Sequence, residues 1–254
     1  PIRDVGVIAC LCLAAAAFAK AGAMPLHSWV PDAAETAPVP AVALLPASLD
    51  KLLGIYLFAR ISLGMFDINI QMRSLFLLIG AVTVIAAVMA ALVQHNLRRL
   101  LGFHAVSQVG YMVLGIATGT PIGVLGGLFH MVNNAIYKSC LFLTAGAAER
   151  RAGTGDLNRM GGMARAMPVT FIAALIAALA ISGVPPINGF VSKWMVYQGL
   201  VELGKDGGVL WAVCLVAAMF GSALTLASFV KVIHCVFLGQ PDPETPQDGP
   251  TPNI

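Results

Sequence analysis

The sequence predicts an all-α protein, a polytopic transmembrane helical bundle. Only 11% of its 254 residues are charged, whereas 58% are apolar, and the mean hydropathy is +0.85. A water-soluble domain carries about 25% charged residues on average. About 20 apolar residues suffice for one helix to cross a bilayer. Three stretches of that length contain no formally charged side chain: 74–94, 166–192 and 207–230.

Hydrophobicity along the chain predicts about seven membrane segments. Long runs of Ala, Leu, Val and Ile suit helices, because barrel strands would alternate polar and apolar residues. The expected segments are 5–24, 40–64, 74–94, 101–119, 122–148, 167–200 and 209–238.

Prolines predict that two of these helices are discontinuous. Residues 183–189 (Gly-Val-Pro-Pro-Ile-Asn-Gly) divide the sixth segment, and five prolines interrupt the first two. Proline removes a backbone donor and clashes with the preceding turn, so a helix is expected to break there. Broken helices at membrane depth favour a transport site, whereas the alternative for 25–46 is an extramembrane loop. The five prolines are Pro25, Pro31, Pro38, Pro40 and Pro46.

Basic residues in the connections predict the orientation. Arg98 and Arg99 follow the third segment, and four arginines follow the fifth, so loops 95–100 and 149–166 are expected to share the cytoplasmic face. The bilayer would then be the inner membrane of a bacterial or archaeal cell. The opposite face receives Arg3, Arg60, Arg73 and Lys205.

Both ends of the chain carry separate expectations. Residues 239–254 contain five prolines and no apolar run, which indicates an extended or disordered tail. Because the first residue is Pro1 and no signal-peptide layout precedes the first segment, we expect a part of a longer chain.

Composition also excludes several classes of function. The net charge of +3 is too small and dispersed for a nucleic-acid surface. The five cysteines are odd in number, lie in or beside apolar runs and form no four-ligand cluster. We therefore predict no metal, no cofactor and no nucleic-acid partner, and a lipid bilayer as the surroundings.

Four lysines in or beside apolar sequence are the candidate functional residues. Lys138 lies 16 residues from one end of its segment and 10 from the other, so it reaches neither interface easily. Lys20 precedes the first break, Lys193 follows the second, and Lys51 adjoins Asp50. An ionised residue at mid-bilayer costs several kcal/mol, about 3 on insertion scales, and usually marks an ion path. Because burial disfavours the ammonium form, such amines suit proton exchange. Snorkelling or structural ion pairs are the alternative.

Further polar residues accompany Lys138. His130, Asn134 and Lys138 are spaced i, i+4 and i+8, which places them on one helical stripe. An imidazole, an amide and an amine in that order suit a water-linked relay, although a satisfied core histidine is an equal alternative for His130 and for His104. The preceding helix adds His104, Ser107, Gln108 and Tyr111.

Four sequence blocks, in order, resemble the antiporter-like subunits of proton-pumping NADH:quinone oxidoreductase (complex I), Mrp-type sodium/proton antiporters and membrane-bound hydrogenases. The resemblance covers about residues 5–238 and family helices seven through thirteen. The blocks are KAGAMPLHSWVPDA from Lys20, NLRRLLGFHAVSQVGY from Asn96, HMVNNAIYK from His130 and SGVPPINGFVSK from Ser182.

The resemblance implies an inverted-repeat fold. Residues 5–64 would be the end of a first repeat and 74–238 a complete second repeat. Lys20 matches the lysine of the first broken helix and Lys51 that of the eighth helix, while Lys138 and Lys193 match those of the eleventh and twelfth. The modulating glutamate of family helix five has no counterpart in these residues. Pro46 and Asn134 stand where some members have histidine.

The resemblance also implies a function. The chain would be a proton-translocating subunit without a redox cofactor, partnered by other membrane subunits of a redox or antiporter complex. The relay would comprise Lys20, Asp50, Lys51, His130, Lys138 and Lys193. Alternatives are an Mrp-type antiporter module in which Asp50 or backbone carbonyls bind Na+, a subunit of a ferredoxin- or formate-linked hydrogenase, and a nonconducting scaffold.

Overall fold

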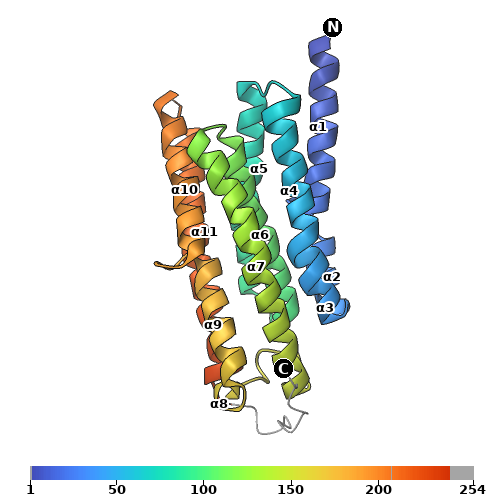
Figure 1. Cartoon of the computed structure of the whole chain (residues 1–254), viewed down its shortest axis with the longest axis vertical. Coiled ribbons are helices and arrows are strands. Elements are labelled where there is room, and N and C mark those ends of the chain that lie inside the picture. Colours follow the sequence, from blue (N-terminus) through green and yellow to red (C-terminus); the bar gives the residue numbers. More distant parts are fainter. Residues whose placement is uncertain (1, 207, 241–254) are drawn as a thin grey trace.

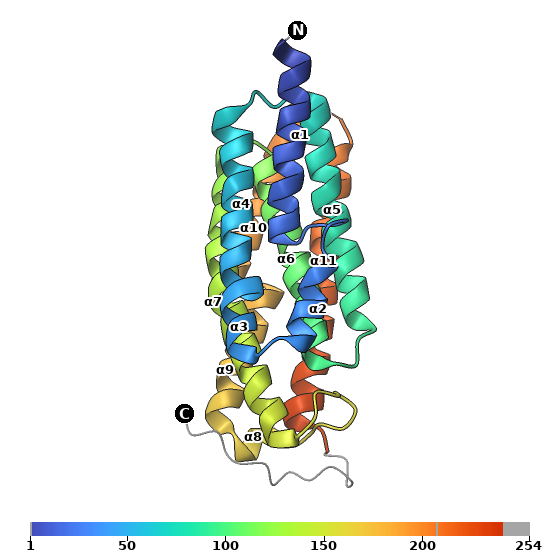
Figure 2. The same ribbon diagram turned by 90° about the vertical axis from the view of Figure 1, so that its right-hand side faces the viewer.

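Long helices lie side by side and form a bundle in the computed structural model, which describes residues 2–206 and 208–240 (Figures 1 and 2). Over those residues there is no β-strand, only one isolated bridge. The predicted all-α class is therefore correct. Within residues 2–206 and 208–240, four helical spans are long and apolar enough to cross a membrane, namely Val39–Met65, Ile70–Leu92, Leu97–Ala117 and Leu210–Leu238. The count of seven segments stays a prediction.

The first two segments contain one break and one continuous helix. A helix break follows α1, where Gly22 has φ +80°, and Trp29 Nε1 spans the break by donating to Ala19 O over 2.9 Å. The second segment runs from Val39 to Met65 through two π-helical turns. The elements are α1 (Ile2–Ala21), α2 (Trp29–Thr36), α3 (Val39–Leu44), a π turn (Leu45–Leu49), α4 (Asp50–Arg60) and a π turn (Ile61–Met65).

Two prolines that were expected to break helices do not. Pro31 lies in the first turn of α2, where a backbone N–H has no acceptor within the helix, so its absence costs no helical hydrogen bond. Pro46 lies in the π turn before α4, and the wider turn keeps the helix continuous around the pyrrolidine ring. The stretch 25–46 is therefore mostly helical rather than a loop.

Short polar caps start the three central helices. Asn69, Asn96 and Thr120 each accept a hydrogen bond from the backbone N–H three residues later, which satisfies a donor that the helix leaves free. The helices are α5 (Ile70–Leu92), α6 (Leu97–Ala117) and α7 (Pro121–Ala152).

The predicted break in the sixth segment is present. Gly183, with φ +79°, ends the first half, and the second half begins at Asn188. In Figure 1 the two halves, α9 and α10, lie one below the other beside α11. The last elements are α8 (Met163–Ala166), α9 (Pro168–Ser182), α10 (Asn188–Leu203), a 3₁₀ turn (Gly204–Asp206), α11 (Leu210–Ile233) and a π turn (His234–Leu238).

The two arginine-rich connections meet at one end of the bundle, as predicted. An antiparallel bridge pairs Asn96 with Asp156, and Leu157 N donates to His95 O over 2.9 Å. Their predicted bounds were too wide. Residues 97–100 are already the first turn of α6, because Asn96 caps it, and α7 continues to Ala152 until Gly153 turns with φ +69°. Of the predicted tail, 241–254 lies outside the described residues.

The buried interior alternates apolar and polar levels. One apolar cluster contains Leu97, Leu100 and Leu101 of α6, and a second contains 109–117 of the same helix. Between them lies a buried level that we call the polar layer. Its members are Lys51, His104, Ser107, Gln108, His130, Asn133, Asn134, Lys138, Ser192, Lys193, Thr225 and Ser228.

At the arginine-rich end of the bundle, Arg98 of α6 connects α7 to the backbone just after α2. Its Nε lies 2.9 Å from Glu149 Oε2 of α7, and its Nη1 donates over 2.8 Å to the carbonyl oxygen of Ala37, the residue directly after α2.

Replacing Arg98 by alanine is expected to lower the free energy of unfolding by about 2 kcal/mol, because the largely buried Glu149 loses its counter-charge. Thermal unfolding in detergent measures this, with Arg60→Ala, exposed at the opposite end, as control. Adding Glu149→Gln should recover part of the loss, and an additive double variant would contradict the coupling.

Candidate functional site

Lys193 lies at the break between α9 and α10. It is 2% exposed, and its Nζ donates to Ile181 O over 2.9 Å and lies 3.5 Å from Ser182 O. The last carbonyls of a helix lack partners and carry partial negative charge, so the end of α9 favours an ammonium. The Nζ also lies 4.5 Å from the centre of the Tyr111 ring. The broken helix thereby holds an amine without a carboxylate.

Lys138 occupies the middle of α7. Its side chain is fully buried, and its Nζ donates to Leu101 O of α6 over 2.8 Å. The rings of Phe142 and Phe229 lie 5.7 and 5.9 Å from the same atom, within reach of a cation–π interaction.

Lys51 occupies the start of α4. It is 1% exposed, and its Nζ donates to Pro46 O over 2.7 Å. Lys51 and Lys138 interact as like charges. Asn134 of α7 also reaches this region, with its Nδ2 3.5 Å from Ala47 O. Among the described residues, no ion pair involves Lys51, Lys138 or Lys193.

Lys20 differs from the other three lysines in its exposure. Its side chain is 49% exposed, and its Nζ lies 2.6 Å from Asp50 Oδ1. Asp50 thus pairs with Lys20 of α1, although Lys51 adjoins it in sequence. The reason is that α1 packs along α4 and ends beside it, so Lys20 of its last turn meets Asp50 at the start of α4.

His130 joins three helices within the polar layer. Its Nδ1 lies 2.9 Å from Ser192 Oγ of α10, and its Nε2 lies 3.1 Å from Gln108 Oε1 of α6. The predicted stripe of His130, Asn134 and Lys138 is fully buried, but each member bonds to a different partner rather than to the next member. Transfer along this stripe would therefore need intervening groups or waters.

Sequence patterns missed several members of this region. Ser192 and Ser228 are common helix residues, and nothing in their spacing marked them. Lys231, which lies outside the polar layer, was also missed, although it follows an uncharged run, the same signal that found the other lysines. Its Nζ lies 3.2 Å from both Leu92 O and Gln94 O, at the end of α5.

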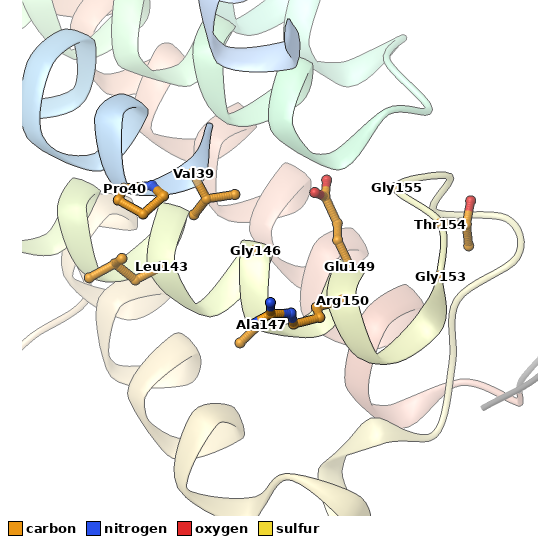
Figure 3. Close-up of a pocket in the computed structure, with 10 residues that line it drawn as sticks. All are labelled: Val39, Pro40, Leu143, Gly146, Ala147, Glu149, Arg150, Gly153, Thr154 and Gly155. Carbon is orange, nitrogen blue, oxygen red and sulfur yellow. The ribbon is translucent and has the colours of Figure 1, made fainter. Parts of the chain in front are cut away.

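A cavity of about 720 Å³ lies away from the polar layer, between α3 and the end of α7 (Figure 3). Its one carboxylate, Glu149, is held by Arg98. None of its lining residues belongs to the polar layer. The lining comprises Val39, Pro40, Leu143, Gly146, Ala147, Glu149, Arg150, Gly153, Thr154 and Gly155.

Metal ligands do not gather in the part of the chain that the structure describes. Over residues 2–206 and 208–240, no three His, Cys, Asp or Glu side chains are grouped in a way that would hold a metal ion.

The bundle, its two broken helices and its buried amines define a polytopic integral membrane protein with a polar interior. A comparison with family models gives the particular family. Residues 5–225 match the model described as "NADH:quinone oxidoreductase/Mrp antiporter, TM", and the chain belongs to this family. The resemblance inferred from the four sequence blocks is confirmed.

Individual relatives come from several kinds of complex. The chain is 34% identical over 236 residues to formate hydrogenlyase subunit 3 of Escherichia coli, covering 87% of this chain and 39% of the relative. It is 32% identical to NADH-quinone oxidoreductase subunit N of Desulforudis audaxviator, covering 99% and 50%. A chain of the Mrp complex from a Dietzia species superposes with a TM-score of 0.86 at 31% identity, covering 96% and 44%. The chain thus spans half or less of each relative.

Proposed function

We propose that this chain translocates protons across a membrane through its buried lysines. The single observation that carries the proposal is the set of three buried amines, Lys51, Lys138 and Lys193, each bonded to a backbone carbonyl and none to a carboxylate. A fixed ion pair would hold each charge in place, whereas an amine bonded only to a neutral carbonyl can lose its proton without leaving a buried anion behind.

The proposed path runs from Lys51 through Lys138 to Lys193. Lys51 and Lys138 are connectors, and Lys193 is the terminal exchange site at the second break. Because Lys51 and Lys138 repel each other when both are charged, a proton on one favours its loss from the other. His130 bridges α6, α7 and α10 between these amines and would order the intervening groups.

The Lys20–Asp50 pair would supply the first step. Opening the pair exposes a negative charge directly before Lys51 and favours its protonation. A change of charge elsewhere in a multisubunit membrane complex would drive this opening. The relatives come from hydrogenase, complex I and Mrp systems, which supports such partners, and the arginine-rich end would face the cytoplasm of a bacterial or archaeal cell.

Replacing Lys193 by glutamine tests the proposal. We expect the initial rate of proton movement to fall at least tenfold, because an amide fills similar space without exchanging a proton. The measurement uses the full-length protein in its complex, in inverted vesicles with a pH-sensitive dye. Lys205→Gln, exposed after α10, is the matched control. An undiminished rate in an assembled Lys193→Gln complex would reject the relay and favour a nonconducting scaffold.

Sodium/proton antiport is the second candidate, favoured by the structural likeness to the Mrp complex. Proton movement in vesicles prepared with choline in place of sodium separates the two. A rate that needs sodium supports antiport, and an unchanged rate supports a proton-only pump.

A further inference from the structure

His104 is a buried imidazole that the lysine path leaves unused. It is 0% exposed, and its Nε2 lies 2.7 Å from Ser228 Oγ of α11. Its Nδ1 makes no hydrogen bond to any residue in the described part of the chain. Most buried polar atoms have a partner, so an unpaired ring nitrogen in the polar layer calls for a functional explanation.

His104 interacts electrostatically with both neighbouring amines, those of Lys138 and Lys193. Its ring packs on Phe229 with 4.8 Å between centroids, and Lys138 Nζ lies 5.9 Å from the centre of the same Phe229 ring. Ser228 and Phe229, which contact it from α11, are neutral.

The helix α6 arranges these contacts along its length. Leu101, whose carbonyl receives Lys138, precedes His104 by one turn, and Tyr111, whose ring lies under Lys193, follows it by two turns. Residues at these spacings lie on one side of a helix. His104 therefore stands between the α6 contacts of the two lysines.

We propose that His104 is a proton-carrying group between Lys138 and Lys193, an inference that rests on the proposed function. The imidazole takes a proton at Nδ1 from the ammonium of one lysine, directly or through one water, and leaves that lysine as a neutral amine. The imidazolium then gives one proton to the neutral amine of the other lysine and returns to neutral imidazole. Repulsion among the three groups favours a single charge at a time, so each uptake promotes the next release.

The test is the replacement His104→Gln, in the full-length protein within its complex. Glutamine still hydrogen-bonds to Ser228 but carries no exchangeable ring proton. We expect the rate of proton movement in inverted vesicles to fall at least tenfold, with assembly on native gels and thermal stability unchanged. His95→Gln is the matched control, because His95 is exposed in the loop before α6.

A second variant, Ser228→Ala, tests the pH dependence of the rate, which would not change if His104 had a purely structural role. It removes the partner of His104 Nε2 and keeps the helix, so we expect the pH dependence of the rate to shift. An unchanged pH profile in Ser228→Ala would overturn the inference, and this variant decides if His104→Gln fails to assemble.

Lys193→Gln measured in parallel separates the two hypotheses. A lost rate in Lys193→Gln together with a near-normal rate in His104→Gln overturns the role of His104 and leaves the relay standing. A normal rate in Lys193→Gln rejects the relay itself. Lost rates in both variants, with the His95 control unaffected, support the inference.

Discussion

Replacing Lys138 by alanine is expected to reduce proton movement to background while the complex still assembles. Lys138 is the central amine of the proposed path, fully buried and bonded to Leu101 O. Its removal takes away the amine that exchanges the proton; the other buried ionisable side chains of α7 are His130 and Tyr137, whose hydroxyl lies 3.4 Å from His130 Nε2. Assembly should persist because Lys138 has no carboxylate partner, so the variant leaves no buried charge uncompensated.

The replacement Lys138→Arg distinguishes proton exchange from a fixed positive charge. A guanidinium keeps the charge but does not release its proton in proteins. If the relay is correct, Lys138→Arg loses proton movement as fully as Lys138→Ala. Normal movement in Lys138→Arg would mean that the site needs only a cation, which contradicts the relay.

The measurements for Lys138 follow the acidification of inverted vesicles with a pH-sensitive dye, normalised to the amount of assembled complex. Lys231→Ala is an informative comparison, because Lys231 of α11 also donates to backbone carbonyls, but its acceptors, Leu92 O and Gln94 O, lie at and just beyond the end of α5. We expect Lys231→Ala to lower thermal stability and to retain most of the proton movement. A loss equal to that of Lys138→Ala would place Lys231 on the path.

Replacing Gly189 by alanine is expected to cause the largest loss of stability. Gly189 is the second residue of α10 and lies directly against the end of α9, and a Cβ there would fall on the carbonyl oxygen of Ala180. Backbone atoms of a helix end cannot move aside as a flexible side chain does. Overpacking of this kind costs about 3 kcal/mol. The displaced helix start would also move Lys193 away from Ile181 O.

The midpoint of thermal unfolding of the detergent-solubilised protein measures the effect of Gly189→Ala. The matched control is Gly64→Ala in the exposed π turn after α4, because a Cβ at Gly64 meets nothing within 4 Å. Equal midpoints for the two variants would contradict the close packing of Gly189 in α10 against Ala180 in α9.

Much of the architecture follows from sequence because each membrane helix satisfies its own backbone hydrogen bonds. Hydrophobic length alone therefore predicted α5 and α11, with ends that differ from the observed ones by up to five residues. The second break was predictable for a local reason, since two consecutive prolines and Gly183 permit no regular helix. Pro31 and Pro46 were wrongly expected to break helices. The effect of a proline depends on its position, and the first turn of a helix or a π turn accommodates it.

The partners of the candidate residues depend on packing between helices, which sequence spacing does not contain. The pattern of charged residues in apolar sequence identified Lys51, Lys138 and Lys193, and all three are buried. The same pattern placed Lys20 with them, yet Lys20 is half exposed and pairs with Asp50. The difference arises because Lys20 ends α1 beside α4, whereas Lys138 faces α6 and α11.

By itself, the sequence determined that this chain is a helical membrane protein with amines in apolar segments and a helix break within residues 183–189. Both properties are local, set by hydrophobic length and by proline chemistry. Only the tertiary structure decided that His104, Gln108, His130 and the three lysines meet in one polar layer between two apolar clusters. That arrangement depends on which helix faces are buried against one another, and contacts between segments distant in sequence fix it.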